Sequence, residues 1–132
     1  MTQEEKQLLL TDLCARLPYG VKFKIGDYSD YNLIGIVISD EHPIKVEVIE
    51  KGVPYKIEVS LDIIKPYLRP MSSMTEEEKI DYQAFFNYDG VEYPEEYIDW
   101  LNKKMFDYRG LIEKGLAIEA NGGMYNNKEE QQ

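Results

Sequence analysis

The sequence is poor in the residues on which most metal and redox sites depend. It has one cysteine, Cys14, and one histidine, His42. A lone cysteine cannot close an internal disulfide, so we expect a reducing compartment and a buried, hydrophobic Cys14. A lone histidine needs partners to act as a base or a metal ligand, so we expect His42 to be a solvated loop residue. The sequence therefore predicts no metal site and no cofactor.

Long apolar runs are also missing. No segment approaches the roughly 20 apolar residues that cross a bilayer. The first residues, Met1–Glu5, are acidic where a secretory signal would be basic and then apolar. We therefore expect a cytoplasmic protein that does not bind membranes.

Motifs of common catalytic chemistry are absent as well. The sequence has no phosphate-binding glycine loop, serine elbow, CxxC pair or HExxH pattern. Asp27 and Asp30 lack the spacing of a calcium loop, and we interpret them as residues that cap turns. The 25 carboxylates could supply an acid pair, but nothing selects two of them. We predict that the chain is not an enzyme; a weak carboxylate-based enzyme is an alternative.

Positive charge is scarce in the second half of the chain. Residues 71–132 hold 14 acidic and 6 basic residues, whereas residues 1–70 hold 11 and 9. Such an acidic surface repels phosphate groups, so we expect no direct nonspecific binding of nucleic acids. This distribution leaves room for a local basic patch on the strands of the first half, which carry Lys22, Lys24, Lys45, Lys56, Lys65 and Arg69.

The first 70 residues predict a helix followed by a small antiparallel sheet. Thr2 and Glu5 form a capping box, and Leu17-Pro18 ends the helix. Between them lies an apolar stripe of Leu9, Leu10, Leu13, Cys14 and Leu17. Four β-like runs follow, most of them alternating apolar and charged residues, at 21–25, 33–38, 44–49 and 55–59.

The details of this strand region favour an SH3-like β-barrel of about five strands. We expect residues 26–32 to form a loop and Gly35 to mark a bulge. Ser60 should cap a helical turn at Leu61–Ile64, and Tyr67–Arg69 should form a short closing strand. The predicted fold class is α+β, with residues 1–70 forming the N-terminal helix and barrel.

Residues 71–120 predict an acidic helical segment that packs on or beside the barrel. Thr75 and Glu78 form a second capping box, and Pro94 suits the first turn of another helix. The apolar positions of the first helix are Ile80, Ala84, Phe85 and Tyr88, and those of the second are Tyr97, Ile98, Leu101 and Met105. We expect a third short helix at Tyr108–Lys114 and a disordered tail at 121–132.

Two candidate surfaces follow from these patterns. The chain has 11 tyrosines, and aromatic residues in barrel loops either line a binding groove or pack against flanking helices. The hypothetical partner surface consists of Tyr28, Tyr31, Tyr55, Lys65, Tyr67 and Arg69. The alternative surface is either a solvated face or a mimic of DNA phosphates that occupies a nucleic-acid-binding protein; it consists of Glu76, Glu77, Glu78, Asp81, Glu92, Glu95, Glu96 and Asp99.

Several segments of the sequence resemble those of a known family. They are Thr2–Leu10, Leu13–Val21, Ile63–Thr75, Asp99–Leu101 and Phe106–Ala117. They resemble a family of small uncharacterised proteins of gut anaerobic bacteria, often found in prophage or mobile-element contexts. The resemblance covers nearly the whole chain and implies a mobile-element or host-interaction role, without assigning a role to any residue. Together with the missing catalytic motifs, it favours a non-enzymatic module that binds a protein or peptide; the oligomeric state is left open.

Overall fold

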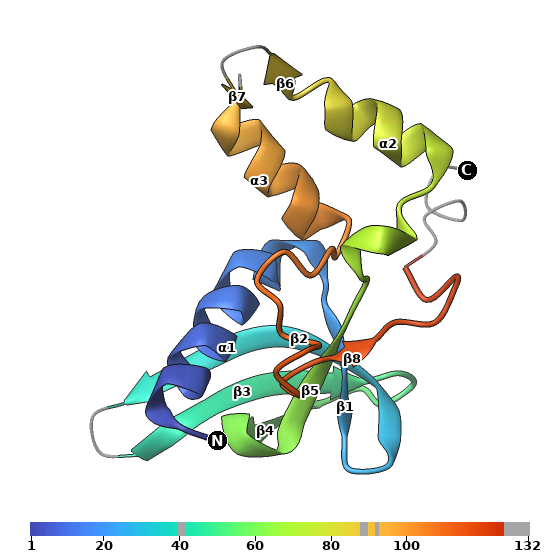
Figure 1. Ribbon diagram of the computed structural model, residues 1–132. Coiled ribbons are helices and arrows are strands. Elements are labelled where there is room, and N and C mark those ends of the chain that lie inside the picture. The colour runs from blue at the N-terminus through green and yellow to red at the C-terminus, as the bar shows by residue number, and fades with distance from the viewer. Residues whose placement is uncertain (40–41, 88–89, 92, 126–132) are drawn as a thin grey trace.

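A six-stranded sheet with one helix against its face forms the larger part of the molecule, and two further helices extend from it (Figure 1). The computed structural model describes residues 1–39, 42–87, 90–91 and 93–125. The elements are α1 (Gln3–Arg16), β1 (Lys22–Ile25), β2 (Tyr28–Ser39), β3 (His42–Glu50), β4 (Lys56–Ser60), β5 (Ile64–Leu68), α2 (Glu76–Gln83), β6 (Phe86–Asn87), β7 (Gly90–Val91), α3 (Pro94–Lys103) and β8 (Ile118–Glu119). No helix among the described residues is both long and apolar enough to cross a membrane.

Helix α1 begins as its capping box predicts. The Thr2 hydroxyl accepts from the Glu5 amide, and the Glu5 carboxylate accepts from the Thr2 amide. Leu9 and Leu13 are fully buried in the core. Cys14, however, is exposed, so the prediction of a buried cysteine is wrong. The reason is that the helix turns Asp12 and Arg16 inward, which places Cys14 on the solvent side.

The sheet has the order β4-β3-β2-β1-β5-β8 and is open across the described residues. Neighbouring strands are antiparallel except β5 and β8, which are parallel. The predicted α+β class is confirmed, whereas closure into an SH3-like barrel is not seen. The sheet instead gains a sixth strand, because the segment after α3 returns to β5 and leaves β4 at the other edge.

Strand boundaries depart from the sequence prediction at two places. The loop expected at 26–32 is only a tight turn at Gly26 and Asp27, so Tyr28 and Tyr31 lie in β2. Gly26 has φ of 56°, which favours glycine there. The closing strand β5 also begins earlier than predicted, at Ile64, directly after a 3-10 turn that Ser60 caps. His42 begins β3, and its side chain lies outside the described part of the structure.

Gly35 sits at a register shift between β2 and β3, as the sequence predicts. A Cβ at this position would meet the carboxylate of Glu47 on β3, so a larger residue here would require that side chain to move. Alternation along each strand then turns one face of the sheet toward α1. The core on that face includes Leu9, Leu10, Leu13, Val21, Phe23, Leu33, Val46, Val48, Ile64 and Leu68.

The second half of the chain is less helical than predicted. Helix α2 starts at its capping box but ends at Gln83, and Ile80, expected on its buried side, is 68% exposed. Pro94 does begin α3. The third helix expected at Tyr108–Lys114 is a series of turns. In the expected tail, the described residues 121–125 include a partly buried Tyr125; residues 126–132 lie outside the described part, as does Tyr88.

Candidate functional site

Helices α2 and α3 form an arm, residues 75–103, that extends from the sheet and ends at the β6–β7 hairpin (Figure 1). Aromatic rings pack between the two helices. Tyr82 and Phe86 have ring centroids 5.0 Å apart, and Phe85 lies 5.6 Å from Tyr97 and 5.8 Å from Trp100. These offset and edge contacts stabilise the arm from within. These rings connect α2 with α3, while α3 also contacts α1.

The pKa of Tyr97 is raised to about 12. Burial among the rings is the main cause, and a hydrogen bond and electrostatic interaction with Tyr82 add to it. The phenol of Tyr97 is thus neutral at ordinary pH and contributes to the packing of the arm as an uncharged ring.

An ion pair fixes the root of the arm to the end of β5. Arg69 Nη2 lies 2.6 Å from Glu78 Oε1, and Arg69 Nη1 lies 2.8 Å from Glu78 Oε2. The Arg69 guanidinium also lies 4.2 Å above the centre of the Phe106 ring. Burial alone would raise the pKa of Glu78, but hydrogen bonds from Arg69 and from the Thr75 amide outweigh it, and the pKa is lowered.

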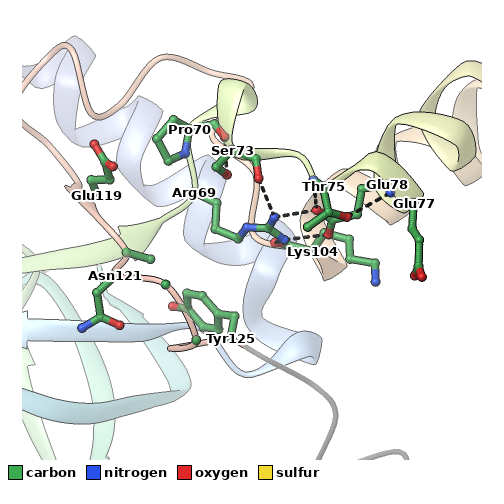
Figure 2. Close-up of a pocket in the computed structure, with 13 residues that line it drawn as sticks. Arg69, Pro70, Ser73, Thr75, Glu77, Glu78, Lys104, Glu119, Asn121 and Tyr125 are labelled. Atoms are coloured by element: carbon green, nitrogen blue, oxygen red, sulfur yellow. Dashed lines mark hydrogen bonds and ion pairs between the residues drawn. The ribbon is translucent and has the colours of Figure 1, made fainter.

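Beside this ion pair lies an open cavity of about 600 Å³ (Figure 2). Its lining residues are Arg69, Pro70, Ser73, Thr75, Glu77, Glu78, Lys104, Glu119, Ala120, Asn121, Gly122, Gly123 and Tyr125. Figure 2 shows the Arg69 guanidinium directed at Glu78 and at the carbonyl groups of Ser73 and Lys104. Because these internal acceptors occupy its donors, Arg69 acts as a structural cation here. Among the described residues, no three histidine, cysteine or acidic side chains cluster in a way that could hold a metal ion.

The acidic surface predicted from the sequence lies largely on the arm. Six of its residues are exposed: Glu76, Glu77, Asp81, Glu95, Glu96 and Asp99. Glu78 is not part of this surface, because it is buried against Arg69, and Glu92 lies outside the described residues. Lys79 pairs with Glu76 at 3.4 Å. The arm also exposes apolar side chains, namely Ile80, Phe86, Val91, Tyr93 and Ile98.

The predicted tyrosine surface is not brought together. Tyr28 and Tyr31 are close enough on β2 for Tyr28 to help raise the pKa of Tyr31, after burial and the Glu50 carboxylate. Tyr31, however, stacks on Phe23 at 6.1 Å and is only partly exposed. Lys65 is exposed near the start of β5, at the same end as the Tyr28 turn, whereas Arg69 lies beyond the other end of β5.

The two remaining residues of that surface also differ in their settings. Tyr55 is 65% exposed in the segment just before β4. Tyr67 lies on β5, is partly buried, and pairs with Ile118 of β8. The six residues are therefore spread over both ends of the sheet, and no single surface contains them all.

The structure contains a buried polar network that the sequence did not predict. Asp12 accepts hydrogen bonds from Arg16 Nε at 2.9 Å and from Arg109 Nε at 3.2 Å, and both Asp12 and Arg16 are fully buried. Arg16 Nη2 also donates to the Phe106 carbonyl at 2.6 Å. Arg109 donates to the Tyr108 hydroxyl. The i,i+4 spacing of Asp12 and Arg16 was visible, but it is also typical of exposed helices.

Tyr125 joins the C-terminal segment to the sheet. Its hydroxyl accepts from the Lys22 amide at 2.8 Å and can donate to the carbonyl of Tyr67 at 2.8 Å or that of Lys22 at 3.2 Å. The hydroxyl thus fills the place where β1 and β5 separate. Burial raises the pKa of Tyr125, so the phenol remains neutral in this position.

Comparison with known proteins adds no relative. Neither protein-family models, curated proteins nor solved structures gave a match to this chain.

Proposed function

We propose that this protein is a non-enzymatic protein–protein interaction module and that the arm is its docking element. The observation that supports this most is the combination of an internally packed scaffold with exposed carboxylates and apolar side chains. On most protein surfaces, exposed apolar side chains stand singly. At binding surfaces, they form a patch that a polar rim surrounds. The arm has this composition at its tip, where Phe86 pairs with Val91 and Tyr93 follows.

The exposed side chains of the arm favour a partner with basic residues. Glu95 and Glu96 are exposed in the first turn of α3, next to Tyr93. A partner with lysine or arginine around an apolar side chain would complement both features. We place this partner in the bacterial cytoplasm, as the resemblance to mobile-element proteins implies.

Site-specific photocrosslinking tests the proposal. A benzophenone side chain at Tyr93 should capture a specific partner in cells of the source bacterium, and the same group at Tyr28, which is exposed on the sheet, serves as the matched control. Reversing charge with Glu95→Lys and Glu96→Lys should lower the yield of the Tyr93 product about tenfold. Equal products from Tyr93 and Tyr28, or a yield that charge reversal leaves unchanged, would contradict the arm as docking element.

The exposed carboxylates of the arm also favour a second candidate, an acidic DNA mimic that inhibits a nucleic-acid-binding protein. Six exposed acids outnumber two exposed cations, Lys79 and Lys103, on the described arm residues 75–87, 90–91 and 93–103. If this candidate holds, double-stranded DNA should compete with the arm for the captured partner. An ordinary interaction module should keep its partner in the presence of DNA.

A further inference from the structure

Strand β4 is a free edge of the sheet. All five of its residues pair with β3 on one side, and β4 stands first in the strand order (Figure 1). Within the part of the chain that the structure describes, no strand covers its other side. The opposite edge is β8, which has only two residues. An exposed strand edge offers unpaired amide and carbonyl groups that can pair with another strand.

On this edge Lys56 has an ion-pair partner within one copy, whereas Glu58 faces another carboxylate. Glu58 lies directly opposite Glu47 on β3, and such like-charge pairs destabilise a sheet. Lys56 forms its ion pair with Glu47, at 2.9 Å. Among the described residues, no cation lies within ion-pair distance of Glu58, although its charge, after that of Glu47, helps to raise the pKa of Lys56. The edge therefore carries one carboxylate that a cation from outside would neutralise.

We propose that a second copy of this chain binds here, β4 against β4, antiparallel and related by a two-fold axis at Ile57. In this register Lys56 of each copy lies opposite Glu58 of the other, so two ion pairs form across the axis. Ile57 meets its own counterpart, and Tyr55 meets Val59. Ile57 is 40% exposed and Tyr55 is 65% exposed, so both have apolar surface to bury.

Neighbouring registers are worse for physical reasons. Centring the axis on Glu58 would place two carboxylates opposite each other, and centring it on Lys56 would place two ammonium groups there. A shift by a single residue would put apolar side chains opposite charged ones on the wrong face. Only the register centred on Ile57 satisfies the charges and the apolar side chains together.

Pairing through β4 ends at a dimer. Pro54 has no amide to donate, so it limits the ladder close to β4 itself. A two-fold pairing uses the same edge on both copies and leaves no free β4 for a third. The contact is small, so we expect a weak dimer, and this dimer would present two arms to a partner. The inference does not depend on the proposed function of the arm.

Analytical ultracentrifugation of the full chain tests the dimer. The average mass should approach twice that of the monomer between about 1 µM and 1 mM protein, the range expected of a small interface. Lys56→Glu alone and Glu58→Lys alone should each abolish association, because each makes the pairs repulsive. An equimolar mixture of the two variants should restore it. Lys65→Glu, an exposed lysine on β5, is the control and should leave association unchanged.

A crosslink identifies the register. In a Cys14→Ser background, Ile57→Cys should form a disulfide-linked dimer on oxidation, because directly opposed residues have Cβ atoms about 5 Å apart. Val59→Cys keeps both charged residues and should crosslink far more slowly, since its counterpart lies several residues away. Three results would overturn the proposal. The chain could stay monomeric up to about 1 mM, the dimer could persist in both charge-reversal variants, or Val59→Cys could crosslink faster than Ile57→Cys. Circular dichroism confirms that each variant is folded.

Discussion

At the root of the arm, one guanidinium holds one carboxylate with both of its terminal nitrogens. Arg69 and Glu78 are nine residues apart, and each lies beside a different element, β5 and the first turn of α2. The side chains are only 19% and 11% exposed, so water screens the pair weakly. Glu78 also accepts from the Thr75 amide at 2.9 Å. A single carboxylate thus caps a helix and ties that helix to the sheet.

This arrangement predicts an acid-dependent contribution to stability. The pKa of Glu78 is below its ordinary value of 4.5 in the folded protein. The ionised group therefore stabilises the fold above that value, and the contribution is lost as the pH falls through the lower, folded pKa. Glu78→Gln should cost about 2 kcal/mol near neutral pH and flatten the fall in stability below about pH 5.

Urea unfolding over a pH series measures this effect. Glu77→Gln is the matched control, because Glu77 is the exposed neighbour in the same helical turn. The control should change the free energy of unfolding by less than about 0.5 kcal/mol. If the two variants behave alike, the buried ion pair does not stabilise the root.

At the scale of elements, the sequence predicted helix caps and a strand bulge correctly, but it did not predict pairing between distant segments. Both capping boxes and the bulge at Gly35 formed as predicted, because each depends on residues close in the chain or on one strand neighbour. The early start of β2 depends on the tight turn at Gly26. The polar residues that follow Gly26 are typical of a loop, so the sequence predicts a longer connection there. Strand β8 depends on pairing with β5, fifty residues away, which no local pattern encodes.

The same limit applies to the candidate site. The acidic residues of the arm could be read from composition, and most of them are exposed as expected. The ion pair between Glu78 and Arg69 could not be predicted, because the sequence pattern places Arg69 in a binding surface on the barrel. The aromatic packing between α2 and α3 also went unseen, since it needs the angle between two helices.

The buried network of Asp12 links α1 to the segment after α3 and gives a second prediction. Asp12→Asn leaves the charges of Arg16 and Arg109 without their carboxylate, and breaking a buried ion pair in this way costs about 3–5 kcal/mol. Thermal and urea unfolding should both show the loss. Asp62→Asn is the control, since the Lys6–Asp62 pair is largely exposed and should contribute less than about 1 kcal/mol. A loss below about 1 kcal/mol for Asp12→Asn would contradict a stabilising role of this buried network.

At the scale of the whole molecule, the sheet and the arm are two packed units that meet at Phe106. Its ring contacts Trp100 of the arm at 5.6 Å and lies under Arg69 at 4.2 Å. Its carbonyl accepts from Arg16, which belongs to the network on α1. Phe106 is fully buried. The ring and the carbonyl of one residue therefore connect the aromatic packing of the arm with both ion-pair systems.

This position predicts that Phe106 makes unfolding of the two units cooperative. Trp100 is the only tryptophan, so its fluorescence reports on the arm, while far-UV circular dichroism reports on the whole chain. In the native protein the two urea transitions should coincide. Phe106→Leu keeps an apolar side chain but removes the ring contacts, so the fluorescence transition should move to lower urea than the dichroism transition.

A core substitution in the sheet separates loss of coupling from simple loss of stability. Phe23 is as buried as Phe106, but it stacks on Tyr31 within the sheet and has no ring contact with the described residues of the arm. Phe23→Leu should therefore lower both transitions together, by about 1–2 kcal/mol, and keep them coincident. If Phe106→Leu also keeps them coincident, the coupling of the arm to the sheet does not depend on the Phe106 ring. If the transitions are already separate in the native protein, the arm unfolds independently and Phe106 is only a packing residue.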